Sequence, residues 1–215
     1  MFIVAGTPGA GKSAVFSLGS LAKRTFNADD RAAELNGGSY RAIPPAVRKL
    51  VNVEFETFVR TCIAERQSFA LETTLRSTIT FEQAHMARLA GFQVIMTYVA
   101  LDTFESHIAR VTQRARRGGH SASETTLRLI YNRRLANLAA CLRPEDSGVD
   151  ELRIYDNSAA GRMPRLVFET TAGQITRLAT DLPAWLQTAL HWIDSHVSKI
   201  REDLACGRDG YSFGA

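Results

Sequence analysis

Residues 6–13 have the residue types and spacing of a phosphate-binding loop. They read Gly-Thr-Pro-Gly-Ala-Gly-Lys-Ser, which matches the pattern GxxxxGK[ST], and they follow the apolar run Phe2–Ala5. Glycines let consecutive backbone N–H groups point at one anion, and the N-terminus of a following helix adds partial positive charge. Lys12 would bridge the β- and γ-phosphates of a nucleoside triphosphate, and the Ser13 hydroxyl would bind Mg²⁺. An ordinary glycine-rich turn is the alternative, but the strand pattern before the motif and the helical pattern after it favour nucleotide binding.

A loop of this kind does not identify what receives the phosphate, since kinases, GTPases, motors and AAA machines all use it. The chain has no GTPase-type NKxD motif, and no aspartate ends an apolar strand beyond the second as a standard Walker B motif would require. The chain is also short, with 215 residues. These features favour a compact kinase.

Two acidic sites follow the loop in positions that suit catalysis. Asp29 and Asp30 come where a second strand should end, and Glu72 closes the apolar run 69–71. Ligands of open α/β sheets bind beyond the carboxyl ends of the strands. Asp29 could therefore accept the proton of an acceptor hydroxyl, and Glu72 could orient Mg²⁺-bound water or bind a substrate hydroxyl. The alternatives are that Asp29 or Asp30 caps the following turn and that Glu72 pairs with Arg76.

An arginine stripe, formed by Arg110, Arg114 and Arg117, has the spacing of one helix face. No acidic residue lies between Glu105 and Glu124 to neutralise it. Like charges at this spacing repel by about 0.2–0.5 kcal/mol per pair, and a bound anion would remove that penalty. The stripe therefore predicts an Arg-rich helical lid that closes over the transferring phosphoryl group.

Further features surround the stripe. The basic patch is extended by Arg116, Arg128, Arg133 and Arg134. Residues 118–120, Gly-Gly-His, would supply a hinge. A solvated basic face is the alternative, and a nucleic-acid surface is disfavoured because only Tyr131 is near enough to stack on bases. Residues 155–158, Tyr-Asp-Asn-Ser, could hold a nucleotide base or form a plain turn.

The order of apolar patterns predicts the fold class. Short apolar runs alternate with helical patterns, which indicates an α/β P-loop domain of three layers with a mostly parallel sheet and helices on both faces. Helices are expected over residues 11–24, 45–66, 80–90, 103–117, 123–142 and 182–204, and strands over 2–5, 69–71, 92–101 and 152–155. A hairpin is expected to join 166–168 to 174–177. We predict one domain over residues 1–206 and a flexible Gly-rich tail at 207–215.

Composition limits the function classes. Twenty-six Lys and Arg against 22 Asp and Glu give a net charge of only +4, which is too modest to indicate a nucleic-acid binder. The three cysteines form neither a CxxC motif nor a disulfide framework, as expected of free thiols in a reducing compartment. No apolar run is long enough to span a membrane, and the chain opens on a strand pattern rather than a leader. We therefore expect a cytoplasmic protein without membrane contacts.

In its ordered motifs the chain resembles the zeta-toxin family of P-loop kinases over residues 2–158. The matching elements are Pro8-Gly9-Ala10-Gly11-Lys12-Ser13, Asn27-Ala28-Asp29, Glu72-Thr73-Thr74-Leu75, Gly91-Phe92, Arg110-Val111 with Arg114, Gly118-Gly119-His120 and Tyr155-Asp156-Asn157-Ser158. Leu129 and Ile130 stand where relatives often have arginines, and Ser123-Glu124 stands where they usually have Pro-Glu. The stretch from Arg110 to His120 is the most specific part of the resemblance.

The resemblance implies a kinase that uses ATP and Mg²⁺ to phosphorylate the 3′-hydroxyl of the sugar in UDP-N-acetylglucosamine, and a small helical antitoxin as partner. It assigns the general base to Asp29, the substrate-side acid to Glu72, and lid arginines to Arg110 and Arg117. The residues expected to bind nucleotide are Gly6, Thr7, Pro8, Gly9, Ala10, Gly11, Lys12, Ser13, Ala14, Arg114 and Asn157. Those expected to bind the acceptor are Asp29, Glu72, Thr73, Arg76 and His120. A kinase for another acceptor (nucleoside, dinucleotide or antibiotic) and a nucleotide-dependent regulatory module are the alternatives.

Overall fold

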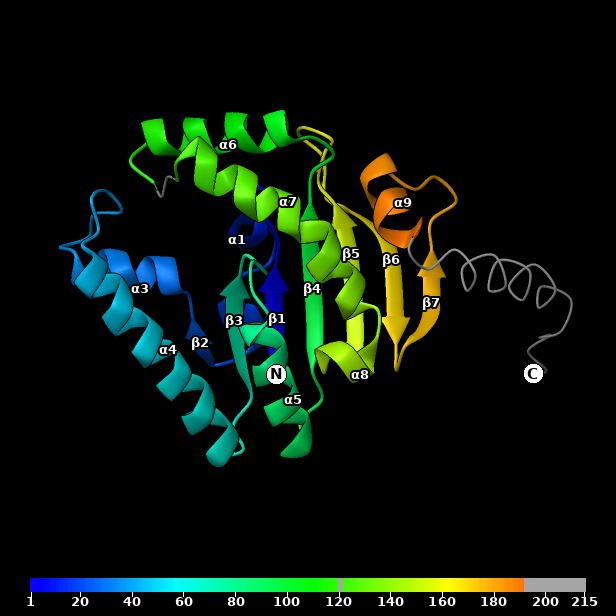
Figure 1. The fold of residues 1–215 in the computed structure, drawn as a ribbon, viewed down its shortest axis with the longest axis horizontal. Coiled ribbons are helices and arrows are strands. Elements are labelled where there is room, and N and C mark those ends of the chain that lie inside the picture. The colour runs from blue at the N-terminus through cyan, green and yellow to red at the C-terminus, as the bar shows by residue number, and fades with distance from the viewer. Residues whose placement is uncertain (120–121, 192–215) are drawn as a thin grey trace, which may run out of the picture.

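Seven strands form one sheet at the centre of the structure, a computed structural model that describes residues 1–119 and 122–191 (Figure 1). The strands are β1 (Phe2–Ala5), β2 (Arg24–Phe26), β3 (Phe69–Thr73), β4 (Ile95–Ala100), β5 (Glu151–Asp156), β6 (Arg165–Thr171) and β7 (Gln174–Leu178). Their order is β2-β3-β1-β4-β5-β6-β7. The pairs among β1 to β5 are parallel, whereas β5–β6 and β6–β7 are antiparallel. The expected parallel sheet and the expected hairpin are both confirmed.

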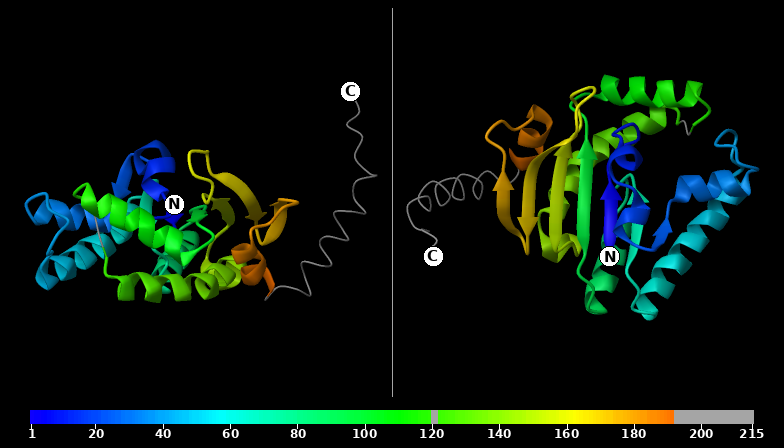
Figure 2. Two further views of the ribbon diagram at one scale, coloured as in Figure 1. Left: turned by 90° about the horizontal axis from the view of Figure 1, so that it is seen from above. Right: turned by 180° about the vertical axis from the view of Figure 1, so that it is seen from behind.

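Helices lie on both sides of this sheet. They are α1 (Lys12–Val15), α2 (Leu18–Leu21), α3 (Ala28–Leu35), α4 (Pro45–Ala64), α5 (Ile79–Leu89), α6 (Phe104–Arg116), α7 (Glu124–Cys141), α8 (Pro144–Ser147) and α9 (Ala184–His191). Figure 1 shows α5, α7 and α8 in front of the sheet, and Figure 2 shows α1 and α2 on its other side. Helix α6 crosses above the carboxyl ends of the central strands. The three-layer prediction is confirmed, with a front layer that is more extensive than the back layer.

The back of strands β4 to β7 carries none of the described helices, as the rear view in Figure 2 shows. The alternation of side chains along β5 is typical of a sheet with one solvated face. Leu152 and Ile154 are buried on the front face, while Glu151 and Arg153 alternate with them and lie on the back face. Arg153 pairs with Glu169 of β6 at 2.9 Å on this outer face. Antiparallel sheets commonly bury one face and leave the other solvated.

Strand β1 is buried on both faces and fixes the position of the phosphate loop. Ile3, Val4 and Ala5 are almost completely buried between β3 and β4. Val4 pairs with Glu72 and Ala5 with Thr73. The loop after β1 and the end of β3 therefore emerge side by side at the carboxyl edge of the sheet.

Two expectations about local structure were wrong. The helix expected over residues 11–24 is two single turns, α1 and α2, because Phe16 adopts an extended conformation and packs edge-to-face on Tyr155 with ring centroids 4.9 Å apart. Helix α3 was not expected, although Asn27 provides its N-cap by accepting from the backbone N–H groups of Asp29 and Asp30.

Some expectations lie outside the described residues. The last predicted helix is present from Ala184 to His191, but the rest of 182–204, the tail 207–215 and His120 are not described. No helix of the described residues combines the length and the apolar character needed to cross a membrane.

Candidate active site

The phosphate loop packs so closely on its neighbours that glycine is required at two positions. A Cβ on Gly6 would collide with the carbonyl oxygen of Val99, and one on Gly9 would lie 2.8 Å from the carbonyl oxygen of His107. Both glycines have positive φ, 142° and 85°. The loop then enters α1, whose first N–H groups have no partner within the helix. These donors and the helix N-terminus make the loop a suitable cradle for phosphate.

Lys12, Ser13 and Glu72 meet at this cradle. Lys12 Nζ donates to the carbonyl of Gly6 over 2.7 Å and lies 3.4 Å from Glu72 Oε1, while Ser13 Oγ donates to Glu72 Oε2 over 2.9 Å. Burial lowers the pKa of Lys12, and the negative charge of Glu72 opposes that change. Glu72 thus compensates the buried ammonium, so the alternative that it pairs with Arg76 is wrong. The carboxylate also connects Lys12 to the hydroxyl expected to bind Mg²⁺.

Asp29 lies beside this group, in the first turn of α3. Its side chain is 41% exposed and its carboxylate lies 3.9 Å from Arg48. Asn27, which caps the helix, also donates to Glu72 Oε2 over 3.4 Å, so the start of α3 is tied to the end of β3. The negative charge of Asp29, like that of Glu72, opposes the lowering of the Lys12 pKa by burial. Asn27 provides the N-cap of α3, so the alternative that Asp29 or Asp30 is the cap is wrong.

The arginine stripe lies on α6, above the loop. Arg110 NH2 donates to the carbonyl of Asn157 over 2.9 Å, and Asn157 Nδ2 donates to the carbonyl of Ala10 over 2.8 Å. The positive charge of Arg114 contributes to lowering the pKa of Lys12, so Arg114 is close enough to the phosphate loop to act on it electrostatically. The structure brings Arg110, Arg114 and Asn157 to the phosphate loop. Arg117 lies at the end of α6, exposed to solvent.

The remaining predicted acceptor residues differ in their surroundings. Thr73 Oγ1 lies 3.4 Å from Thr80 Oγ1 and accepts from the N–H of Leu75, so its hydroxyl stabilises the turn after β3. Arg76 is exposed beyond that turn.

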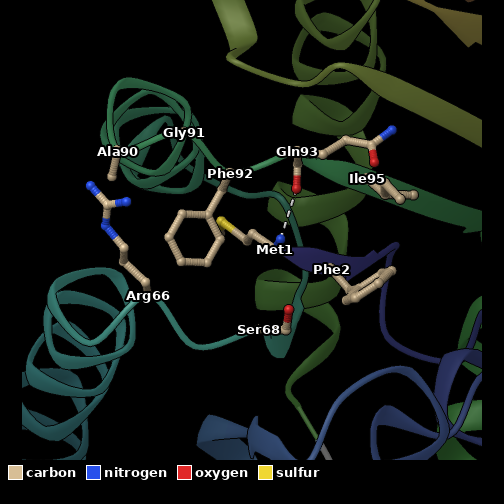
Figure 3. Close-up of a pocket in the computed structure, with 9 residues that line it drawn as sticks. All are labelled: Met1, Phe2, Arg66, Ser68, Ala90, Gly91, Phe92, Gln93 and Ile95. Carbon is tan, nitrogen blue, oxygen red and sulfur yellow. Dashed lines mark hydrogen bonds between the residues drawn. The ribbon is translucent and has the colours of Figure 1, made fainter.

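A cavity of ≈ 450 Å³ opens next to Ser13 and Glu72. It extends between the segment after α1 and the start of α3, and its lining includes Asn27, Asp30 and Arg31. The cavity lies at the carboxyl edge of the sheet, beside the phosphate cradle, where ligands of open α/β sheets bind, and its lining includes Asp30 but not Asp29. A second pocket, of ≈ 380 Å³, lies around Met1, Arg66 and Phe92 at the opposite end of the strands, away from these residues (Figure 3).

His107 joins α6 to the phosphate loop. The imidazole is completely buried and its Nδ1 lies 3.0 Å from the carbonyl oxygen of Pro8, which can only accept, so Nδ1 carries the proton. Burial is the main cause that lowers the pKa of His107 from 6.5 to about 4, and the charges of Arg134, Lys12 and Arg110 add to it. The neutral imidazole therefore holds α6 on the loop at neutral pH.

This pKa predicts a loss of stability in acid. Between about pH 6.5 and about pH 4 the unfolded chain binds a proton at His107 that the folded chain does not, so stability falls as the pH falls through this range. Over this pH range the shift changes the free energy of unfolding by about 3 kcal/mol. We expect His107→Gln, which keeps a donor for Pro8, to show a correspondingly shallower dependence of the free energy of unfolding on pH. Parallel curves for the two proteins would contradict this assignment.

Comparison with known proteins places these features in a family. A family model described as Zeta toxin matches residues 1–160. The chain belongs to the zeta-toxin family. This family member is 27% identical over 128 residues to an uncharacterised protein of Haemophilus influenzae, a match that covers 59% of this chain and 88% of the relative.

Solved structures share the P-loop kinase fold of this zeta-toxin family member. The crystal structure of AvrRxo1-ORF1:-ORF2 with ATP matches with a TM-score of 0.60 and 15% identity, over 81% of this chain and 59% of that chain. This chain therefore spans less than two thirds of the length of that relative. A structure of the PezAT toxin–antitoxin system of Streptococcus pneumoniae matches with a TM-score of 0.56 and 15% identity, over 87% of this chain and 82% of that chain.

Two residues of the site region were not recognised from the sequence. Asn27 both caps α3 and contacts Glu72, and an Asx residue two positions before a pair of acids was an available signal for the cap. Arg134 was assigned to the basic surface patch, but only 7% of it is exposed. Nothing in the local pattern distinguishes it from the exposed Arg133 beside it.

Proposed function

We propose that this protein transfers the γ-phosphoryl group of ATP to a hydroxyl of a small metabolite. The observation that carries the proposal is the meeting of Lys12, Ser13 and Glu72 at the phosphate loop, with Asp29 close enough to act on Lys12. This arrangement offers a cation for the phosphates and two carboxylates at the place where an acceptor would enter.

The residues at the loop also suit Mg²⁺. The Ser13 hydroxyl and the Glu72 carboxylate are hard oxygen donors 2.9 Å apart, and Mg²⁺ is commonly bound through few protein oxygens together with the phosphates of its substrate. When bound, Mg²⁺ would neutralise part of the charge on the β- and γ-phosphates. Ser13 would ligate it directly, and Glu72 would bind it directly or through water.

Asp29 would act on the acceptor. Its carboxylate takes the hydroxyl proton while the hydroxyl oxygen forms a bond to the γ-phosphorus and the bond from that phosphorus to the ADP oxygen breaks. Arg110 and Lys12 would hold the transferring group in line, and Arg114 and Arg117 would approach it from α6 as the lid closes. The positive charges stabilise the negative charge that spreads over the phosphoryl oxygens.

A sugar nucleotide is the acceptor class that we favour, and UDP-N-acetylglucosamine is the specific candidate implied by the family. The cavity beside Ser13 is lined by polar groups, among them Asp30, Glu34 and Arg31, which suit the hydroxyls of a sugar. A small antitoxin is the partner we infer on the same grounds, since the PezAT structure is of a toxin–antitoxin system.

The acceptor is tested by supplying Mg-ATP with UDP-N-acetylglucosamine and following ADP and the phosphorylated sugar nucleotide. We expect one phosphate transferred per ADP formed, and no transfer to an analogue that lacks the 3′-hydroxyl. Equal transfer to that analogue would refute the 3′ position. No transfer to either compound would refute this acceptor, and ATP binding that alters the affinity for a protein partner without any phosphorylation would indicate the regulatory module instead.

A further inference from the structure

Arg134 points into the protein rather than toward the basic surface of α7. Only 7% of its surface is exposed. Its guanidinium carbon lies 3.2 Å from the centre of the Tyr131 ring, and NH1 donates to the carbonyl of Tyr131 over 2.6 Å. A buried guanidinium stacked on an aromatic ring is a costly arrangement unless other groups compensate its charge.

The surroundings of Arg134 belong to the rear of the phosphate loop. Arg134 stacks on Tyr131, and the Tyr131 ring packs edge-to-face on the His107 ring with centroids 5.5 Å apart. The charge of Arg134 also acts to lower the pKa of both Tyr98 and His107. Tyr98 lies opposite Ala5, the last residue of β1 before the loop, and His107 contacts Pro8 within it. Arg134 therefore lies behind the loop, on the side away from the cavity at Ser13.

No anionic group is found next to Arg134 among the residues that the structure describes. Burial lowers the pKa of Arg134, and only Tyr131 and Tyr98 oppose that change. Burial raises the pKa of both tyrosines, so both are neutral at pH 7 and supply no counter-charge. His107 is neutral as well, because burial lowers its pKa to about 4.

The hydrogen bonding of this region is also incomplete. Arg134 Nε and His107 Nε2 are buried and have no hydrogen-bond partner among the described residues. The side chains of Tyr98 and Thr7, which interact with each other, are also buried, with at most 1% of each residue exposed. A buried polar group without a hydrogen-bond partner lowers stability, and such costs are typical of functional sites.

We propose that Arg134 is a positioning residue for the nucleotide: its buried charge attracts the phosphates from behind the loop and is compensated only when they bind. The inference rests on the proposed nucleotide site. Electrostatic attraction through a poorly screened interior acts over several ångströms, so direct contact with the phosphates is not required. The charge of the ligand must then decide how much Arg134 contributes, whereas a purely structural role would affect every ligand alike.

Arg134→Met tests this role, because methionine keeps an unbranched stem on Tyr131 without the charge. We expect the Kd for ATP, measured without Mg²⁺ so that the phosphates alone set the ligand charge, to rise about tenfold, which is about 1.4 kcal/mol. The rise should be smaller for ADP and smallest for AMP. Without nucleotide, the midpoint of thermal unfolding should stay unchanged or increase, since an uncompensated buried charge has been removed.

Arg133→Met is the matched control, since it removes the same charge from an exposed neighbour on the same helix, and it should leave all three Kd values within about twofold. Arg134→Gln supplies the same measurements should the methionine variant fail to fold. An equal loss for ATP, ADP and AMP together with a lower unfolding midpoint would overturn the proposal in favour of a structural role, and unchanged Kd values would also overturn it. A wild-type protein that binds none of the three nucleotides would instead refute the proposed function itself.

Discussion

Lys12→Ala should reduce kcat/KM for ATP-dependent phosphoryl transfer by about 10³-fold or more. The ammonium is the positive charge nearest to the expected β- and γ-phosphates, and removing one such group from a water-poor site has effects of this size. Glu72 would also lose the partner that lies 3.4 Å from it, so the carboxylate would be left near the phosphates without compensation. Transfer kinetics measured at saturating and at low ATP will show whether kcat or KM carries the loss.

Lys23→Ala is the control for this variant, because it removes the same charge from an exposed position. It should retain activity within about twofold. Near-normal transfer by Lys12→Ala would mean that the GxxxxGK[ST] loop does not hold the phosphates in the manner described.

Asp29→Asn should retain ATP binding and lose transfer. The amide is of the same size as the carboxylate but cannot accept the hydroxyl proton, so kcat should fall by about 10²–10⁴-fold while the Kd for ATP changes little. Folding should be little affected, since the side chain is half-exposed and its pair with Arg48 is long, at 3.9 Å. Equilibrium binding of ATP and the rate of product formation are the two measurements required.

Asp30→Asn provides the comparison for Asp29→Asn. Asp30 follows Asp29 directly on α3, and its exposed carboxylate accepts from the Tyr40 hydroxyl over 2.7 Å. Because Asp30 also lines the cavity proposed for the acceptor, we expect Asp30→Asn to raise KM for the acceptor while kcat stays within about twofold. If the two variants lose activity equally, the general base is not Asp29, and a shared effect on the start of α3 becomes the explanation.

The sequence predicted the parts of the fold in which local pattern and tertiary packing favour the same structure. The apolar run Phe2–Ala5 is buried on both faces, as a central parallel strand requires, and the glycines after it have the positive φ that the loop needs. The hairpin around residues 172–173 follows from alternating strands on either side of a turn. In these regions few alternative structures satisfy the pattern.

The sequence failed where packing overrides the local pattern. Residues 11–24 have apolar residues at helical spacing, yet Phe16 packs on Tyr155, 139 positions away, and the helix ends there. Helix α3 was not predicted because the acids Asp29 and Asp30 indicated a catalytic or capping role, whereas Asn27 is the residue that starts the helix.

The arginines show the same limit for the site. Spacing placed Arg110 and Arg114 correctly on one helix above the loop, because helix periodicity alone determines which residues share a face. Whether an arginine is buried depends on what the helix packs against, and this is why Arg134 was assigned to the surface. The position of Glu72 next to the loop could be predicted, since the carboxyl ends of adjacent parallel strands meet at one edge of the sheet, whereas its role in catalysis stays a prediction.

Mass spectrometry of a metabolite extract incubated with the protein and Mg-ATP tests the central claim without assuming an acceptor. The account predicts that at least one hydroxyl-bearing small molecule gains a single phosphate, that ADP forms in equal amount, and that both products form at least about 100-fold more slowly with Lys12→Ala and with Asp29→Asn. An extract in which no small molecule gains phosphate, although the protein binds ATP, would contradict the assignment of this site to phosphoryl transfer.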